Sequence, residues 1–193
     1  MTELSSSNPK ADAAMERYAL GDDSAFADLY EALAPRLYAF VFRKLRDVAR
    51  AEDLVQQTLL QLHCARGRFV VGSWVTPWAF AIIRRLYLDQ VRRKQVVVLT
   101  RGGEISHEHP SDHQGPEEFA HSRELEERLR QALTRLSPPQ QAAFELVYFG
   151  HMSHAEAAAV LDVSVASVKL RVQRANQVIR ASIEDQYSGD PNA

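Results

Sequence analysis

The chain has 193 residues, of which 46% are hydrophobic and 25% are charged, and its formal net charge is −2. These values describe a globular protein of one or two domains and exclude an intrinsically disordered chain. No apolar run approaches the roughly 20 residues of a membrane-spanning helix, and the single cysteine excludes an internal disulfide framework. We therefore expect a cytoplasmic protein that does not insert into membranes.

Charge is distributed unevenly along the sequence. Residues 14–95 carry 13 Lys and Arg against 9 Asp and Glu, whereas residues 96–123 carry 2 against 5. Residues 163–183 carry four basic side chains and no acidic one. Because contact with phosphate groups is local, two basic zones allow a near-neutral chain to bind a polyanion.

The N-terminal part predicts a tail followed by two helical segments. Residues 1–13 are polar and serine-rich, and we expect them to form a disordered tail. From Asp23 to Leu45, apolar residues recur every three or four positions, which predicts helical structure with a kink or a new start at Pro35. Another helix is predicted over residues 49–64, and we expect its Cys64 to be a buried, inert thiol.

A loop and a further helix complete the first predicted domain, residues 14–95. The segment RGRFVVGS, residues 66–73, has glycines near both ends and is interpreted as the loop. Thr76 followed by Pro77 predicts a helix cap and a proline at the first helical position. The helix is expected to end near the basic cluster Arg92, Arg93 and Lys94.

Residues 96–116 are predicted to form a flexible linker that begins with an extended piece at Val96–Leu99. The segment is rich in Gly, Pro, His and acidic residues and has no apolar periodicity. No cysteine accompanies His107, His109 and His113, so we interpret them as a solvated tract rather than a metal site.

Residues 117–185 are predicted to form a second helical domain, followed by a disordered tail at 186–193. Capping signatures begin the helices after Ser137 and Ser153, and Ser164 is predicted to cap the last helix. No strands are predicted to pair. The predicted fold class is therefore all-α, with two small helical domains joined by the flexible linker.

The last two helices have the spacing of a helix-turn-helix, with the turn at Asp162. If Val165, Val168, Val172 and Ile179 face inward, the outer face of the last helix is small, polar and basic. Such a helix can enter the major groove of DNA, where Arg reaches guanine and Ser or Lys meets phosphate. The alternative interpretation is a solvated basic helix that packs on a small bundle. The candidate DNA-binding residues are Ser164, Ser167, Lys169, Leu170, Arg171 and Arg174.

Two parts of the sequence resemble the extracytoplasmic-function (ECF) sigma factors, the compact branch of the sigma-70 family. The stretch from Leu136 to Arg180, LSPPQQAAFELVYFGHMSHAEAAAVLDVSVASVKLRVQRANQVIR, resembles their region 4. The segment AEDLVQQTLLQLH and the pattern W(x)3W(x)3I(x)6D from Trp74 to Asp89 are similar to region 2. The chain departs from the family at Ala79, where Leu is common, and at Ile83-Arg84-Arg85, where Ala-Arg-Asn is common. The base preferences of the family are therefore not carried over.

The resemblance implies an alternative sigma factor that binds core RNA polymerase and directs promoter recognition and transcription initiation. Region 2 would dock on the polymerase and melt the minus-ten element, and region 4 would read the minus-thirty-five element as duplex. The resemblance also implies an anti-sigma factor as a further expected partner, because the family uses one.

Candidate residues for these tasks follow from the pattern of exposed side chains. The polymerase would contact the polar strip of the helix at 49–64, formed by Asp53, Gln56, Gln57 and Gln61. Single-stranded DNA requires cationic walls and a flat surface for stacking, and Phe69 with Trp74 could form a pocket for an extruded base. Trp78 is interpreted as a core residue. The candidate minus-ten residues are Arg66, Arg68, Phe69, Arg84, Arg85, Arg92 and Arg93.

The sequence contains no constellation that predicts catalysis. It has no glycine-rich phosphate loop, no HExxH motif and no paired cysteines, so we expect no enzymatic activity, no cofactor and no metal. Two other classes of function remain as alternatives: a dimeric activator with an N-terminal sensor domain, and a helical hydrolase that uses His63 and nearby acids.

Overall fold

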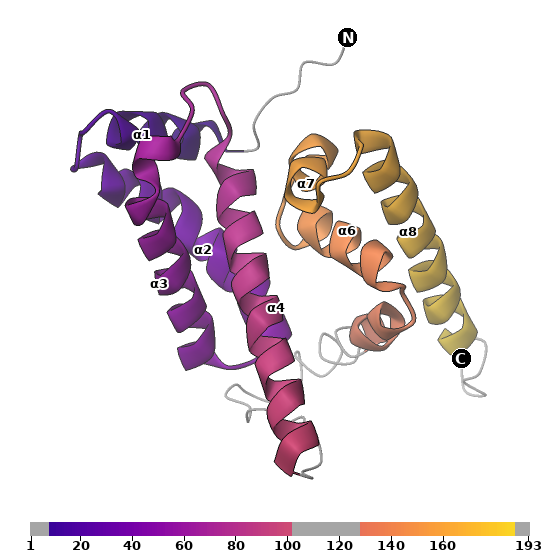
Figure 1. Ribbon diagram of the computed structural model, residues 1–193. Helices are drawn as coiled ribbons and strands as arrows, with labels where there is room; N and C mark the ends of the chain where they lie inside the picture. The colour runs from indigo at the N-terminus through magenta and orange to yellow at the C-terminus, as the bar shows by residue number, and fades with distance from the viewer. Residues whose placement is uncertain (1–7, 102–127, 188–193) are drawn as a thin grey trace, which may run out of the picture.

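The computed structural model describes residues 8–101 and 128–187, and these residues form helices joined by short loops (Figure 1). Most of the predicted linker, at 102–116, and the beginning of the predicted second domain lie outside the described residues. The predicted all-α fold is confirmed for the described part of the chain. Its elements are α1 (Pro9–Ala19), α2 (Ala25–Leu45), α3 (Val48–Cys64), the 3₁₀ turn η1 (Arg66–Arg68), α4 (Val75–Arg101), a helical segment at 128–134, α6 (Pro138–Tyr148), α7 (His154–Leu161) and α8 (Val165–Tyr187).

The prediction of a disordered tail is wrong for residues 8–13, because Asn8 caps α1 and residues 9–13 form its first turns. The Asn8 side chain caps this helix by accepting a hydrogen bond from the Ala11 amide at 3.3 Å, and Pro9 follows as the first helical residue. The other end of the Asn8 amide donates to the Ala32 carbonyl of α2 at 3.0 Å. Ala11 and Met15 are fully buried, so α1 is part of the core.

Helix α4 begins at Val75 and continues to Arg101, which overturns two boundary predictions. Thr76 is a buried residue inside the helix rather than its cap, and Val96–Leu99 is helical rather than extended. A run of valines has a local preference for strands, but a strand needs a partner to pair with. Extending an existing helix instead adds one backbone hydrogen bond for each residue fixed, so propagation prevails over local preference.

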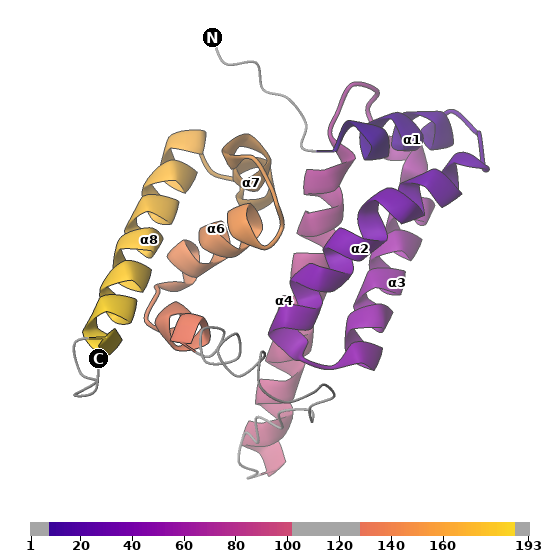
Figure 2. The same ribbon diagram turned by 180° about the vertical axis from the view of Figure 1, so that it is seen from behind.

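The described helices form two groups, with α4 between α1–α3 on one side and α6–α8 on the other (Figures 1 and 2). A single hydrophobic cluster runs through both groups: it contains Phe80 and Ile83 of α4 together with Leu146 of α6 and Ala157 of α7. Gly150, at the end of α6, is buried next to the Phe80 ring. The two groups therefore share one core in this arrangement.

A smaller hydrophobic cluster holds the segment at 128–134 against the second group. Its fully or largely buried members are Ala132, Leu136, Phe144, Ala175 and Ile179. They come from the segment itself, the following turn, α6 and α8. Two separate apolar contacts therefore fix α8: the main core contacts its first turns, and this smaller cluster contacts its second half.

Charged side chains of α2 reach across to the second group. Lys44 pairs with Glu145 of α6, and the exposed fractions of the two side chains are only 14% and 9%. The Lys44 ammonium also lies 5.3 Å from the centre of the Phe40 ring and 5.1 Å from that of Tyr87. Burial raises the pKa of the Tyr87 phenol, and the Glu145 carboxylate raises it further. The pair is thus enclosed largely by protein.

Arg36 and Arg43 extend this contact to the turn between α6 and α7. The Arg36 guanidinium donates to the carbonyl oxygens of Gly150 at 2.8 Å and His151 at 3.0 Å. Arg43 lies over the Phe149 ring, 4.9 Å from its centre. Burial lowers the pKa of Arg36, and the charge of Glu156 opposes this effect. Polar contacts therefore fix the turn that leads into α7.

Replacing Gly150 by alanine tests the tight backbone at the end of α6 together with its contact to α4. The added Cβ would lie 2.6 Å from the Leu146 carbonyl oxygen of α6 itself and 3.1 Å from a carbon of the Phe80 ring in α4, so the end of α6 has to shift. We expect a loss of about 1–3 kcal/mol in the free energy of unfolding, measured by urea denaturation. Gly67→Ala is the matched control, because its Cβ would meet nothing within 4 Å. Equal effects of the two substitutions would contradict the packing described.

The Lys44–Glu145 pair predicts strongly non-additive effects on stability. Lys44→Met leaves the Glu145 carboxylate buried without its cation, and Glu145→Gln leaves the Lys44 ammonium without its anion. Each should lower the free energy of unfolding by about 3 kcal/mol, the lower end of the range for breaking a buried ion pair.

The double substitution should recover most of that loss, since it leaves no unpaired charge. Urea denaturation of the four proteins gives the coupling energy. If each single substitution changed stability by under about 0.5 kcal/mol, as surface changes do, the pair would not be buried in solution.

Candidate nucleic-acid interface

Local hydrogen bonds build the helix-turn-helix as predicted. The Ser153 hydroxyl accepts from the Glu156 amide at 3.2 Å, and the Glu156 carboxylate accepts from the Ser153 amide at 2.8 Å, which closes the capping box of α7. Asp162 ends α7 in the left-handed conformation, with φ of 52°. The Ser164 hydroxyl then accepts from the Ser167 amide at 3.2 Å and caps α8. The predicted caps at Ser153 and Ser164 are confirmed.

The inward face of α8 is the apolar one. Val168 and Ala175 are fully buried, Val172 and Ile179 nearly so, and Val165 is half-buried. This spine packs α8 against α6 and α7, with every third or fourth residue facing the core. The prediction of an inward valine face is therefore confirmed.

The outward residues of α8 fall on two flanks rather than on one face. Arg171 and Arg174 are separated by one turn on one flank; Arg171 is half-buried and Arg174 is exposed. Lys169 is two residues before Arg171, which places it about 200° away around the helix. Leu170 lies between the flanks and is 46% exposed. In the part of the chain whose side chains the structure describes, Lys169, Arg171 and Arg174 form no ion pair.

The predicted polar strip of α3 is exposed over three of its four residues. Asp53, Gln56 and Gln57 are exposed, and Gln57 donates to the Asp53 carboxylate at 2.8 Å. Gln61 is half-buried and accepts from the Arg85 guanidinium at 2.6 Å, so it also ties α3 to α4. The four residues thus come together on one side of α3, but Gln61 is already engaged.

Leu60 belongs to the same surface and was missed at the sequence level. Its side chain is 61% exposed, while its neighbour Leu59 is buried. At about 100° per residue, Leu60 lies on the side of the helix opposite the apolar face formed by Leu54, Val55, Leu59 and Leu62, and this spacing was the signal that could have identified it as exposed. Cys64, one turn further along, is also exposed. The prediction that Cys64 is buried is therefore wrong, because it shares the outward position of Leu60.

A mainly apolar groove of about 580 Å³ adjoins this surface between α3 and the first two helices. Tyr30 and Leu60 are among the residues that line it, and the Arg66 side chain lies at one end. Arg66 contacts the Asp23 carboxylate at 2.8 Å and lies 4.8 Å from the centre of the Tyr18 ring. Arg66, a candidate minus-ten residue, is therefore held against α1 and the turn before α2.

The loop between η1 and α4 places Phe69 differently from the predicted pocket. Its ring stacks on Trp78 with centroids 6.1 Å apart and planes 16° apart, and Trp78 is half-buried against the core as predicted. Trp74, the expected partner of Phe69, is half-buried. At the tip, Val70 is 68% exposed, and the Gly72 amide donates to the Glu16 carboxylate at 2.8 Å, which anchors the loop to α1.

The remaining candidate cations lie around this loop and along α4. Arg68 and Arg85 are exposed, as are Arg92 and Arg93, whereas Arg84 is half-buried. Arg92 lies 4.0 Å from the Asp89 carboxylate, a distance at which a surface pair contributes little. The structure therefore presents exposed positive charges along α4 at Arg85, Arg92 and Arg93.

Two further properties bear on function. Among the described residues, no cluster of His, Cys, Asp or Glu has the size needed to hold a metal ion. None of the described helices combines the length and apolar character needed to cross a membrane.

Comparison with known proteins assigns both halves of the chain. Residues 29–96 match the family described as Sigma-70 region 2, and residues 126–177 match Sigma-70, region 4. The RNA polymerase sigma factor CarQ of Myxococcus xanthus is 31% identical over 86% of this chain and 93% of its own. The ECF RNA polymerase sigma factor EcfG of Rhodopseudomonas palustris is 34% identical over 82% of this chain and 84% of its own.

A solved structure agrees with these matches. The sigma factor RpoE of Bartonella quintana, in a co-crystal with the anti-sigma factor NepR, is 28% identical with a TM-score of 0.65. The alignment covers 82% of this chain and 96% of that one. The two matched regions coincide with the two groups of helices, α2–α4 and 128–134 with α6–α8, in the predicted order. The chain therefore belongs to the extracytoplasmic-function branch of the sigma-70 family of RNA polymerase sigma factors, which direct transcription initiation.

Proposed function

We propose that this sigma factor acts in the cytoplasm, binds core RNA polymerase through α3, and recognises a promoter through α4 and α8. We further propose that it has no catalytic activity of its own, so that the polymerase supplies all the chemistry. The observation that carries the proposal is the outer surface of α8, where exposed cations follow a capped helix start on the side opposite a buried apolar spine.

Reading of the upstream element is assigned to the first half of α8. Arg171 and Arg174 project from one flank and can reach the acceptor atoms of guanine, while Ser164 and Ser167 at the helix start can meet phosphate. Leu170 is 46% exposed between the two flanks and can contact a thymine methyl group. The acid-free composition of this segment supports the proposal, because a carboxylate here would repel phosphate.

The minus-ten element is assigned to α4 and the loop before it. Arg68, Arg85, Arg92 and Arg93 are the exposed cations that would follow the strand, with half-buried Arg84 beside them. Phe69 offers an aromatic face, and an extruded base would replace or extend its stack on Trp78. Arg66 contributes less in this proposal than the sequence suggested, because Asp23 already compensates its charge.

The polymerase contact is assigned to the exposed part of α3: Asp53, Gln56, Gln57 and Leu60. Acidic and amide side chains suit a basic partner surface, and the exposed Leu60 provides apolar area at the centre of the patch. Gln61 supports the patch by joining α3 to α4. An anti-sigma factor is a further proposed partner, supported by the co-crystal of the related RpoE with NepR.

The two alternative functions have less support. A dimeric activator with an α/β sensor would need strands in the first half, where the described residues 8–101 are helical or in short loops. A hydrolase based on His63 would need a nucleophile or acid pair beside it, whereas His63 contacts the Tyr18 hydroxyl. Run-off transcription with core polymerase on a promoter library tests the proposal directly: the chain should confer initiation at a defined sequence, and the chain alone should give no transcript.

Reversing the charge of Asp53 tests the polymerase contact. Asp53→Arg places a cation on the exposed strip without touching the buried face of α3, so we expect weaker binding of core polymerase. The change in the free energy of unfolding should stay below about 0.5 kcal/mol. Glu31→Arg, an equal charge reversal at an exposed position of α2, is the control and should leave binding unchanged. Unchanged core affinity of Asp53→Arg would remove this strip from the interface.

Removing the two arginines of α8 tests the reading of the upstream element. In holoenzyme, Arg171→Ala or Arg174→Ala should cost about 1–3 kcal/mol of promoter binding and relax the preference at one position of the element. Initiation on promoters with single-base changes measures both effects. If strength and preference are unchanged in both variants, these residues do not contact bases.

A further inference from the structure

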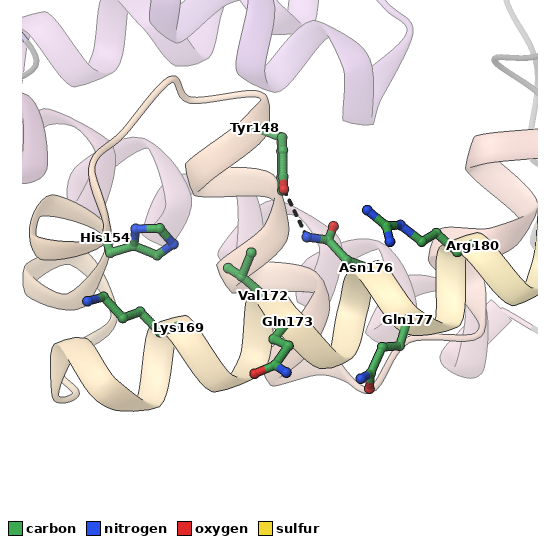
Figure 3. Close-up of a pocket in the computed structure, with 8 residues that line it drawn as sticks. All are labelled: Tyr148, His154, Lys169, Val172, Gln173, Asn176, Gln177 and Arg180. Carbon is green, nitrogen blue, oxygen red and sulfur yellow. Dashed lines mark hydrogen bonds between the residues drawn. The ribbon is translucent and has the colours of Figure 1, made fainter.

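We propose that a groove on the other flank of α8 seats the sugar-phosphate backbone of the upstream promoter element. This inference rests on the proposed function of α8 and adds a second set of residues to it. The groove has a volume of about 440 Å³ and lies between α8, the start of α7 and the end of α6 (Figure 3). The residues that line it include Tyr148, His154, Lys169, Gln173, Asn176 and Arg180.

The lining of the groove is polar and cationic. Lys169 and Arg180 are both exposed, and among the residues whose side chains the structure describes, no Asp or Glu lines the groove. Figure 3 shows the Lys169 and His154 side chains next to each other at one end, with Arg180 and Asn176 toward the other. A groove whose described lining has two cations, three side-chain amides, one hydroxyl and no carboxylate is complementary to a phosphodiester chain.

The spacing of these residues produces a straight stripe. Lys169, Gln173, Asn176 and Arg180 follow one another at four, three and four positions, the spacing of one helix face. From Lys169 to Arg180 the stripe extends about 16 Å, at about 1.5 Å per residue. It can therefore follow a strand over more than one phosphate group.

The hydrogen bond inside the groove prepares a donor for the ligand. Asn176 donates from its side-chain amide to the Tyr148 hydroxyl oxygen at 2.9 Å. The Tyr148 hydroxyl therefore keeps its own proton for a further acceptor, and the Tyr148 side chain is 46% exposed. A phosphate oxygen is such an acceptor.

The position of the stripe relative to Arg171 and Arg174 agrees with the geometry of DNA. The major groove is about 12 Å wide and is bordered by a strand on each side, so a helix inside it has a strand along each flank. With the two arginines directed at base edges from one flank, the Lys169–Arg180 flank faces the border on the other. Contacts to this strand would fix the register of α8 without adding sequence preference.

Two substitutions in the stripe test the inference in holoenzyme. Arg180→Ala removes one cation, and Asn176→Asp keeps the side-chain volume and can still accept a hydrogen bond from Tyr148, but adds a negative charge. We expect both variants to bind the promoter more weakly, whatever the upstream sequence. The loss of affinity should be larger for Asn176→Asp than for Arg180→Ala. For Arg180→Ala the slope of log affinity against log salt concentration should fall by about one. Fluorescence anisotropy of labelled promoter DNA over a salt series provides both values.

Control variants separate this effect from loss of charge or fold. Arg130→Ala removes an exposed cation from the segment at 128–134, outside the groove, and should leave affinity and salt slope unchanged. Arg180→Lys should restore most of the affinity, because a phosphate contact needs the charge rather than the planar shape. Circular dichroism of each variant checks that the fold is retained.

Each of the other outcomes overturns the inference in a distinguishable way. If Arg180→Ala and Asn176→Asp bind promoter like the unchanged protein while Arg171→Ala alters base preference, the groove does not hold the backbone but the proposed function stands. If both variants lose affinity for core polymerase in the absence of DNA, an acidic protein segment occupies the groove instead. If the unchanged holoenzyme shows no dependence on an upstream element, the proposed function of α8 fails first.

Discussion

The placement of the second group of helices on the first depends on the burial of Lys44 against Glu145. An ammonium group removed from water requires an anion, and here it also has two aromatic rings, Phe40 and Tyr87, beside it. Hydrophobic contact between Phe80 and the second group is non-directional, so it leaves the orientation of α6 open. The ion pair and the Arg36 bonds to Gly150 and His151 supply that direction.

Helix α4 serves both groups. One side of it packs in the core of α1–α3, another receives α7, and the solvated arginines occupy the remainder. Because the net contribution of a buried ion pair to stability is small, the pair mainly sets the geometry of the contact between the groups. The stability of that contact comes mainly from the hydrophobic core that the two groups share.

Features that depend on neighbouring residues in the chain were predictable, and features that depend on distant ones were not. The serines that cap α7 and α8 and the valine spine of α8 follow from short-range patterns, and the structure has them where expected. The Asn8 cap with Pro9 after it is an exception, because it is also a short-range pattern, and only its second hydrogen bond, to the Ala32 carbonyl, depends on a residue far away in sequence. The stack of Phe69 on Trp78 rather than with Trp74 likewise reflects how the loop is anchored to α1.

The helix positions of the candidate site were thus available from the sequence, while its division into flanks was not. Arg171 and Arg174 were expected together, and they lie on one flank. The groove on the opposite flank involves Tyr148 and His154, which belong to other helices, and no local pattern indicates which residues of α6 and α7 will border α8. Similarly, the sequence alone predicts Gln61 to be an exposed amide, and only the folded structure shows that Arg85 donates a hydrogen bond to it.

The stack of Phe69 on Trp78 gives the molecule a built-in optical signal. Both tryptophans of the chain, Trp74 and Trp78, lie at the start of α4, and the sequence after residue 101 contains none. Indole emission therefore reports on the loop at Phe69 and its surroundings, whereas the helix-turn-helix contributes only the weaker emission of tyrosine. Four of the six tyrosines also lie in the first group of helices, so only the indole signal is specific to one part of the molecule. Events at the loop can therefore be followed in the unlabelled protein, with neither a dye nor an added residue.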